Sequence, residues 1–362
     1  MTSVSEAKVV LDMIINKARV HLYKPIQVAE ILYRSRASGD LDIEDLETYR
    51  NRSKQWRDIV SLRLVGNVST SSQKFQDNLF EENAMLPRYL KVLNEVNIAK
   101  GGIVENYVYH RCKQKWSLLL EINNYLEKAT TETFKLEEMV NWFTTERGLK
   151  KSIDKVYEIA VHALFTAIVQ ELKAEISLEI KNPKPEVLSD FKEFIRLVLG
   201  IRPNETKLTL PATLYRAGVT YAADTGVDIW TNFGPIVQVK HLSLSKDAIE
   251  DIAESVVAER IIIVCLDAEK EAIEAILGQI GWGKRIQGII TLDDLKNWYD
   301  ISLKKYAQTM GKNVLKYLRV EFKREFPAVV EIDPLLKERG YDPAKLVGEW
   351  KITEQAKLFG FS

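Results

Sequence analysis

The stretch that decides the fold of this chain runs from residue 226 to residue 240 and reads GVDIWTNFGPIVQVK. Two short apolar segments flank a turn-forming stretch that contains Gly234 and Pro235. This pattern predicts a β-hairpin whose strands are Gly226–Thr231 and Ile236–His241.

The apolar residues of the hairpin also predict its register. Side chains alternate between the two faces of a strand, so Asp228 shares a face with Gln238 and Lys240 when the valines and isoleucines of both strands share the other. A loop of three or five residues, or a bulge, puts Asp228 opposite Gln238. A plain four-residue loop would instead pair Asp228 with Val239 and separate the three polar residues.

These three polar residues have the chemistry that phosphodiester hydrolysis needs. Asp228 can bind Mg²⁺, which offsets charge on the phosphate and lowers the pKa of a bound water. Gln238 can offer its amide oxygen to the metal or an amide donor to the phosphate. Lys240 can orient the attacking water and stabilise developing charge. The alternative without a catalytic role is that Asp228 begins a turn and Lys240 is a solvated lysine at a strand end.

The rest of the chain divides into three predicted parts. Residues 1–182 have mostly helical periodicity, residues 183–300 form a mixed α/β core, and residues 301–362 return to helix. The core begins with a helix over residues 185–199 and continues with the hairpin. The later strands of the core are predicted at Arg260–Leu266 and Arg285–Ile290, and its later helices at Lys246–Val257 and Ala268–Leu277. The alternation predicts a mixed sheet covered by helices.

Composition places the protein in the cytoplasm and gives no overall attraction to nucleic acid. The chain has 362 residues, a formal net charge of zero and two cysteines, Cys112 and Cys265. We expect both cysteines to be packed thiols in a reducing compartment. No apolar run is long enough to span a membrane, and the first residues lack the pattern of a signal peptide.

Charge is nevertheless unevenly distributed along the chain. Residues 302–324 hold seven basic residues against one acidic residue, and residues 49–64 hold five against one. Either run fits a DNA-binding face, and either also fits a solvated helix face. The DNA-binding candidates are Lys284, Arg285, Lys312 and Lys316.

The hairpin resembles the PD-(D/E)xK nuclease superfamily, whose signature is an acid before a turn followed by acid-x-Lys about ten residues later. Here Asp228 and the run Gln238-Val239-Lys240 match that signature. The longer stretch of residues 222–242, and the N-terminal stretch ARVHLYKPIQ at residues 18–27, are similar to Type II restriction endonucleases of the HaeII type.

The resemblance implies a Mg²⁺-dependent endonuclease that cuts double-stranded DNA at a specific sequence. It further implies restriction of foreign DNA in a prokaryotic cytoplasm, alongside a protective DNA methyltransferase. A palindromic site is read most simply by a two-fold homodimer.

One departure from the superfamily pattern concerns the metal. Gln238 stands where the superfamily usually has a carboxylate, so a further acid should contribute. Asp224 is one candidate, and the superfamily often draws another acid from the preceding helix. The candidates in and near that helix are Glu186, Asp190, Glu193 and Glu205.

Two other functions remain open from the sequence. A structure-selective nuclease, such as a junction resolvase or a repair enzyme, could be built on the same core. Alternatively, Gln238 could mark a decayed active site in a non-catalytic helical interaction protein.

Overall fold

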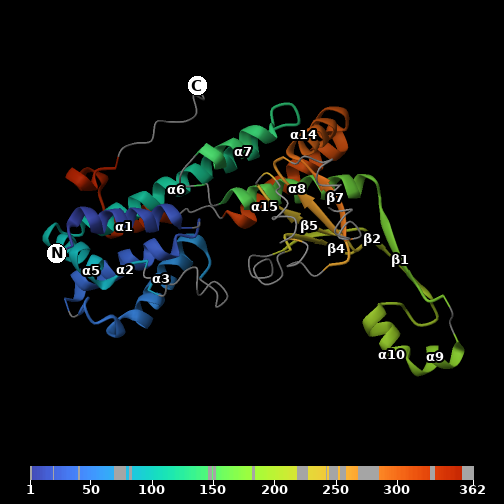
Figure 1. Cartoon of the computed structure of the whole chain (residues 1–362), viewed down its shortest axis with the longest axis horizontal. Coiled ribbons are helices and arrows are strands. Elements are labelled where there is room, and N and C mark those ends of the chain that lie inside the picture. The colour runs from blue at the N-terminus through green and yellow to red at the C-terminus, as the bar shows by residue number, and fades with distance from the viewer. Residues whose placement is uncertain are drawn as a thin grey trace. The chain divides into compact units, whose positions relative to one another are not determined.

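The chain forms two compact units that combine segments from distant parts of the sequence (Figure 1). The first unit contains Met1–Lys128, Glu137–Ile153 and Phe322–Ser362, and the second contains Ala129–Leu136 and Asp154–Glu321. This computed structural model describes residues 2–18, 20–39, 41–68, 79–80, 84–145, 149, 152–181, 184–217, 227–241, 243, 252, 258–267, 285–326 and 331–352. The predicted division at residues 182 and 300 stays a prediction.

The first unit is helical, as the sequence predicts. Its long elements are α1 (Val4–Lys17), α2 (Tyr23–Ser38), α3 (Arg50–Val65), α5 (Pro87–Ala99), α6 (Ile103–Lys128) and α7 (Leu136–Thr145). The short turn η1 (Leu46–Thr48) precedes α3, and the C-terminal elements are α16 (Ile332–Glu338), η8 (Pro343–Lys345) and η9 (Gly348–Trp350). Trp350 is fully buried and packs edge-on against Tyr107 of α6, with 5.4 Å between ring centroids. The C-terminal segment is therefore part of this core.

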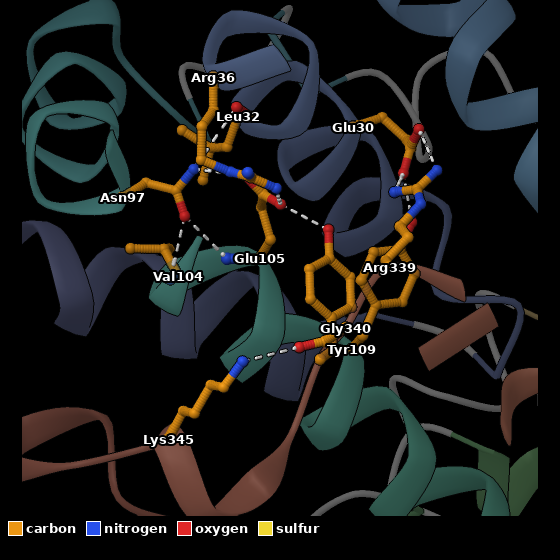
Figure 2. Close-up of polar contacts among 11 residues, drawn as sticks. Glu30, Leu32, Arg36, Asn97, Val104, Glu105, Tyr109, Arg339, Gly340 and Lys345 are labelled. Carbon is orange, nitrogen blue, oxygen red and sulfur yellow. Dashed lines mark hydrogen bonds and ion pairs between the residues drawn. The ribbon is translucent and has the colours of Figure 1, made fainter. Parts of the chain in front are cut away.

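Two buried carboxylates hold the first unit together, as Figure 2 shows. Glu105 of α6 accepts two hydrogen bonds from the Arg36 guanidinium, both at 2.9 Å, and further bonds from Asn97 and Tyr341. Glu30 of α2 accepts hydrogen bonds from Tyr109 and from the guanidinium of Arg339. Because a buried charge is costly unless it is paired and hydrogen-bonded, these contacts fix α2, α6 and the C-terminal segment against one another.

The second unit is built around a five-stranded mixed sheet. Its strands are β3 (Leu214–Arg216), β4 (Ile229–Thr231), β5 (Ile236–Val239), β6 (Ile261–Val264) and β7 (Ile286–Ile290), adjacent in that order. The first three pair antiparallel and the last three pair parallel. The predicted mixed sheet is thus confirmed, and four of its strands lie within their predicted ranges. β3 was not predicted.

Helices cover this sheet. They are α8 (Ile153–Glu171), α14 (Leu292–Asp300), the π-helical turns η6 (Ile301–Lys305) and η7 (Ala307–Gly311), and α15 (Lys312–Glu325). The Tyr299 hydroxyl of α14 donates to the backbone oxygen of Ala160 in α8 at 2.8 Å. Phe165 of α8 and Trp298 of α14 line an apolar cavity of about 440 Å³ together with Val237 of β5. The helices α8 and α14 therefore pack on the same face of the sheet.

A hairpin interrupts the chain between α8 and β3. Its strands, β1 (Glu175–Glu179) and β2 (Lys207–Pro211), pair antiparallel as a separate two-stranded sheet. Between them lie α9 (Pro185–Asp190), α10 (Lys192–Phe194) and η4 (Ile195–Leu199), which together cover the helix predicted over residues 185–199. The helices predicted at Lys246–Val257 and Ala268–Leu277 fall almost wholly outside the described residues.

The turn between β4 and β5 has the loop length that the register argument requires. Ile229 pairs with Val237 and Trp230 with Ile236, so residues 231–235 form the loop. Gly234 has φ +115, and a Cβ there would lie 2.3 Å from Nη2 of Arg260. Glycine is needed at this position both for the backbone angle and for the close approach of the arginine.

We predict that Asn97→Ala destabilises the first unit by about 2–4 kcal/mol. The Asn97 side chain donates to Glu105 and accepts from the backbone N–H groups of Val104 and Glu105 at the start of α6. The alanine variant leaves these buried groups without that partner. Urea unfolding followed by circular dichroism measures the loss.

The matched control is Lys91→Ala on the same helix, α5. Lys91 makes an exposed ion pair with Glu44, and such pairs contribute little to stability. Equal unfolding midpoints for the two variants would contradict the role given to Asn97.

Candidate active site

Asp228 lies at the point where β4 and β5 part. Its Oδ2 accepts a hydrogen bond from the backbone N–H of Val239 at 2.7 Å. In a regular antiparallel ladder that N–H would meet a backbone carbonyl of the neighbouring strand. The carboxylate is 8% exposed, so the divergence of the strands holds a buried acid at the end of the hairpin.

A second buried acid, Glu158 of α8, lies within electrostatic range of Asp228. It is 2% exposed, and its Oε1 and Oε2 accept from the Lys155 ammonium at 2.7 and 2.8 Å. Burial, aided by the negative charge of Asp228 and opposed by Lys155, raises the pKa of Glu158 to about 7. Two carboxylates from different elements thus share one buried environment.

The charges of two amines, Lys155 and Lys240, act on Asp228. Burial raises the pKa of Asp228, while the hydrogen bond from Val239 and the charges of Lys155 and Lys240 lower it. The backbone N–H of Lys240 continues the ladder by donating to the Val264 carbonyl at 2.8 Å. Lys240 is therefore held at the end of β5, with its charge acting on the Asp228 carboxylate.

Gln238 follows the predicted register. The pairing of Ile229 with Val237 has the predicted register and, continued by one residue, sets Asp228 level with Gln238. Val227 packs with Ile236, Ile261 and Ile263, whereas Val237 lines the cavity with Ile262. The shared face predicted for Asp228 and Gln238 therefore stays a prediction. Gln238 is 4% exposed, and its Oε1 has no hydrogen-bond partner in the part of the chain that the structure describes. A buried amide oxygen without a partner is free to bind a ligand.

A buried arginine, Arg216 of β3, also forms an ion pair with Glu158. Arg216 of β3 places Nη1 3.7 Å from Glu158 and Nε 2.8 Å from Glu321 of α15. All three side chains are less than one-tenth exposed. This guanidinium links α8, the sheet and α15, and the ion pair restricts the position of the Glu158 side chain relative to β3.

Another ion pair joins α8 to the end of β5. His241 contacts the Asp154 carboxylate through Nδ1, four residues before Glu158 on the helix. The contact ties the residue after Lys240 to α8.

The acids predicted for the metal site lie elsewhere or outside the described residues. Glu193 is an exposed residue of α10, and its ion pair with Arg196 at 2.8 Å lowers its pKa. Glu186, Asp190 and Glu205 are also exposed residues of the β1–β2 insertion. Asp224 falls outside the described residues. The helix that packs on the sheet is α8 and not the one immediately before the hairpin. A metal-binding role for Asp224 or Glu193 stays a prediction.

Of the predicted DNA-binding residues, three are described and Lys284 is not. Arg285 precedes β7, and its Nε donates to the backbone oxygen of Ala258 at 3.1 Å. Lys312 and Lys316 are exposed on α15. Elsewhere in the same basic run, Lys304 pairs with Asp300 and Lys323 with Glu127. DNA contact by the four candidates stays a prediction.

One signal in the sequence could have identified Glu158. The segment from Val156 to Ala167 is almost entirely apolar, and Glu158 interrupts it. An acid in the buried stripe of a helix requires a partner. The position of that partner depends on how α8 crosses the sheet, which periodicity alone does not give.

The oxygen donors around Asp228 suit a hard cation such as Mg²⁺. Two carboxylates and the unpartnered amide oxygen of Gln238 are ligands of the right type, and Mg²⁺ usually keeps several waters besides one or two carboxylates. The described residues contain no group of three or more His, Cys, Asp or Glu side chains arranged to hold a metal. The residues that could hold a cation here are Asp228, Glu158 and Gln238, and any further ligands would be waters or phosphate oxygens.

Two further predictions concern the cysteines and membranes. Cys112 and Cys265 are both buried thiols outside any disulfide, as predicted. No helix among the described residues has the length and apolar character needed to cross a membrane.

Comparison with known proteins gives matches along almost the whole chain. The family model for the HaeII restriction endonuclease matches residues 7–341. The chain is 44% identical to the Type II restriction enzyme HaeII of Haemophilus aegyptius over 347 residues, which cover 95% of this chain and 99% of that protein. It is 46% identical to the Type II restriction enzyme NgoBI of Neisseria gonorrhoeae over 340 residues, or 93% of this chain and 97% of that one. No solved structure matches. The chain belongs to the HaeII restriction endonuclease family.

Proposed function

We propose that this protein is a Type II restriction enzyme, a sequence-specific endonuclease that hydrolyses phosphodiester bonds of double-stranded DNA with Mg²⁺. Family membership supports the class of reaction. The observation that carries the assignment of the site is the pairing of two buried carboxylates, Asp228 and Glu158, within reach of the charges of Lys155 and Lys240. Such a pairing is costly in a core that has no function for it.

The site also supports a PD-(D/E)xK core. The mixed sheet, the acid before the turn and the Gln238-Val239-Lys240 run agree with that superfamily. Glu158 supplies the carboxylate that Gln238 lacks. The negative charge usually found on the second strand thus comes from α8 instead.

Each residue has a distinct task in this proposal. Asp228 and Glu158 would hold the metal, with Gln238 contributing its amide oxygen. Bound Mg²⁺ would offset charge on the scissile phosphate and lower the pKa of a coordinated water. Lys240 orients the attacking water and stabilises the charge that develops on the phosphate oxygens. Lys155 and Arg216 keep Glu158 in place.

The partners follow from the reaction. A two-fold homodimer suits a palindromic DNA site, and restriction of foreign DNA in the cytoplasm requires a cognate methyltransferase to protect the host. Phosphate contacts would come from Lys284, Arg285, Lys312 and Lys316, which supply affinity more than sequence choice.

Digestion of phage DNA of known sequence tests the proposed function. We expect discrete fragments whose ends map to one recurring short sequence, in the presence of Mg²⁺ and not with EDTA. Cleavage confined to branched or damaged DNA would favour a structure-selective nuclease. No cleavage with any divalent metal would favour a non-catalytic protein.

We predict that Glu158→Gln and Asp228→Asn each lower the initial rate of plasmid cleavage by more than about 100-fold, because each removes a charge that holds the metal. Gel analysis of initial rates at saturating Mg²⁺ measures the loss, and circular dichroism checks the fold. Glu193→Gln is the matched control and should cut at the wild-type rate, since Glu193 is exposed on α10. A wild-type cleavage rate in the Glu158→Gln variant would show that Glu158 does not hold the metal.

We predict that the metal-free protein becomes less stable as pH rises from about 5 to about 8. The pKa of Glu158 is raised from its ordinary value of 4.5 to about 7 in the folded protein. Between those values the folded state binds more protons than the unfolded state, so the free energy of unfolding falls with increasing pH. Urea unfolding in EDTA at pH 5.5 and pH 8 measures the change.

The control is Glu158→Gln, which should flatten this dependence because it removes the titrating acid and its repulsion of Asp228. Addition of Mg²⁺ at pH 8 should restore stability to the wild type, since the metal binds the ionised carboxylates. An unchanged pH dependence in Glu158→Gln would contradict the pKa assignment.

A further inference from the structure

The β1–β2 insertion, here called the arm, spans Glu175–Pro211 and has almost no interior. Among its described residues only Ile201 is buried. In the helical part, residues 184–200, every residue is exposed or half-buried. The large apolar side chains are among the most exposed of the chain, with Leu197 68% exposed and Phe191 57% exposed.

An arm of this kind requires a partner. Short helices are marginal in water unless an apolar face is buried, and an isolated two-stranded hairpin is also marginal. The arm combines both elements. Its exposed apolar residues form one contiguous group in sequence and structure: Val187, Phe191, Phe194, Leu197 and Val198. A contiguous apolar surface of this size marks an interaction site, whereas scattered exposed hydrophobic residues would not.

The charge of the arm argues against DNA as that partner. Its acidic and basic residues are equal in number: Glu175, Glu179, Glu186, Asp190, Glu193 and Glu205 against Lys181, Lys184, Lys192, Arg196, Arg202 and Lys207. A surface that binds the phosphate backbone carries an excess of positive charge. The balanced arm therefore gains no electrostatic attraction to a polyanion.

We propose that the arm is the interface through which two copies of this chain assemble. The arm has a groove of about 330 Å³, lined mainly by apolar residues that include Val187, Leu188, Phe191 and Phe194. Leu197 and Val198 do not line the groove and are the most exposed large apolar residues of this segment. A two-fold axis matches one patch with its own copy, so each protomer's Leu197 and Val198 fill the groove of the other.

The charges of the arm helix fit an antiparallel arrangement. Glu186 and Asp190 lie in its N-terminal half, and Lys192, Glu193 and Arg196 lie in its C-terminal half, where Glu193 pairs with Arg196 and the net charge is one positive. When two such helices cross antiparallel, the acidic half of each faces the basic half of the other. Complementary charge of this kind fixes register and excludes the parallel arrangement, which would bring like charges together.

This interface rests on the proposed function in one respect. A restriction enzyme that cuts both strands of a palindrome needs two active sites related by a two-fold axis. The surface itself is argued from burial and charge alone. Arm substitutions change none of the residues assigned to the active site.

Sedimentation velocity of the full-length protein without DNA tests the interface. We expect the wild type to sediment as a species of twice the 41.5 kDa chain mass. The double variant Leu197→Glu, Val198→Glu should sediment as a monomer, with a dissociation constant raised by more than about 100-fold, since it puts four charges into an apolar contact. A wild-type monomer at all concentrations, or a variant that stays dimeric, would overturn the proposal.

The matched control is Ile59→Glu, Leu62→Glu on α3, whose side chains are 65% and 57% exposed in the first unit. This variant should remain dimeric. A second measurement covers the case in which the arm variant aggregates. Phe194→Cys puts a thiol in the groove and Leu197→Cys puts one on a residue that fills it, while the two native cysteines are buried. Mild oxidation of a mixture of the two variants should give a disulfide-linked dimer on a non-reducing gel. Absence of that dimer would count against the arm.

The two proposals fail separately. A wild-type monomer that still cuts DNA in an Asp228-dependent way overturns the interface and leaves the nuclease assignment intact. A dimer that depends on Leu197 and Val198 but has no nuclease activity supports the interface and overturns the function.

Discussion

The second unit depends on one electrostatic constraint, which is that the carboxylates of Asp228 and Glu158 are both buried away from water. Asp228 and Glu158 are both buried, and burial together with the charge of Asp228 raises the pKa of Glu158, while burial and the charge of Asp154 raise the pKa of Asp228. The surrounding structure offsets these effects with the backbone N–H of Val239 and with the charges of Lys155, Lys240 and Arg216. The compensation is incomplete, since the pKa of Glu158 stays near neutrality. A divalent cation bound to these carboxylates, as we propose, would complete it.

The arrangement of strands and helices follows from the need to bring these groups together. The hairpin sets Asp228 level with Gln238, and the parting of its strands points the carboxylate at a backbone donor. Helix α8 delivers Glu158 across the sheet, and the buried ion pairs of Arg216 with Glu158 and Glu321 lock that crossing. The site therefore has parts from three distant segments of the chain. Each of those segments is held by its own hydrogen bonds or ion pairs, so the geometry does not depend on one flexible loop.

Buried charge also organises the first unit, but with a different outcome. There, Glu30 and Glu105 are each matched by an arginine and by tyrosine hydroxyls, and these contacts join α2 and α6 to the C-terminal segment. Full pairing makes those carboxylates structural. The contrast with Glu158 and Asp228 is one of balance: acids that are fully paired stabilise a fold, whereas acids left close to one another suit a site that receives a cation. The arm presents the same situation with apolar side chains in place of charges. Its helical segment has large apolar side chains that no core of the described chain buries.

The sequence by itself determined the hairpin and its five-residue loop, because strand alternation and loop length are local properties of one short stretch. It also determined the mixed character of the sheet and the helical nature of the first unit, since both follow from periodicity. Only the tertiary structure decided which acid lies within electrostatic range of Asp228. Glu158 lies seventy residues upstream of Asp228 in sequence, beyond the whole arm, and no local pattern encodes how α8 crosses the sheet. The predicted candidate Glu193 is nearer in sequence, but it belongs to the arm insertion, whose helix has no buried face.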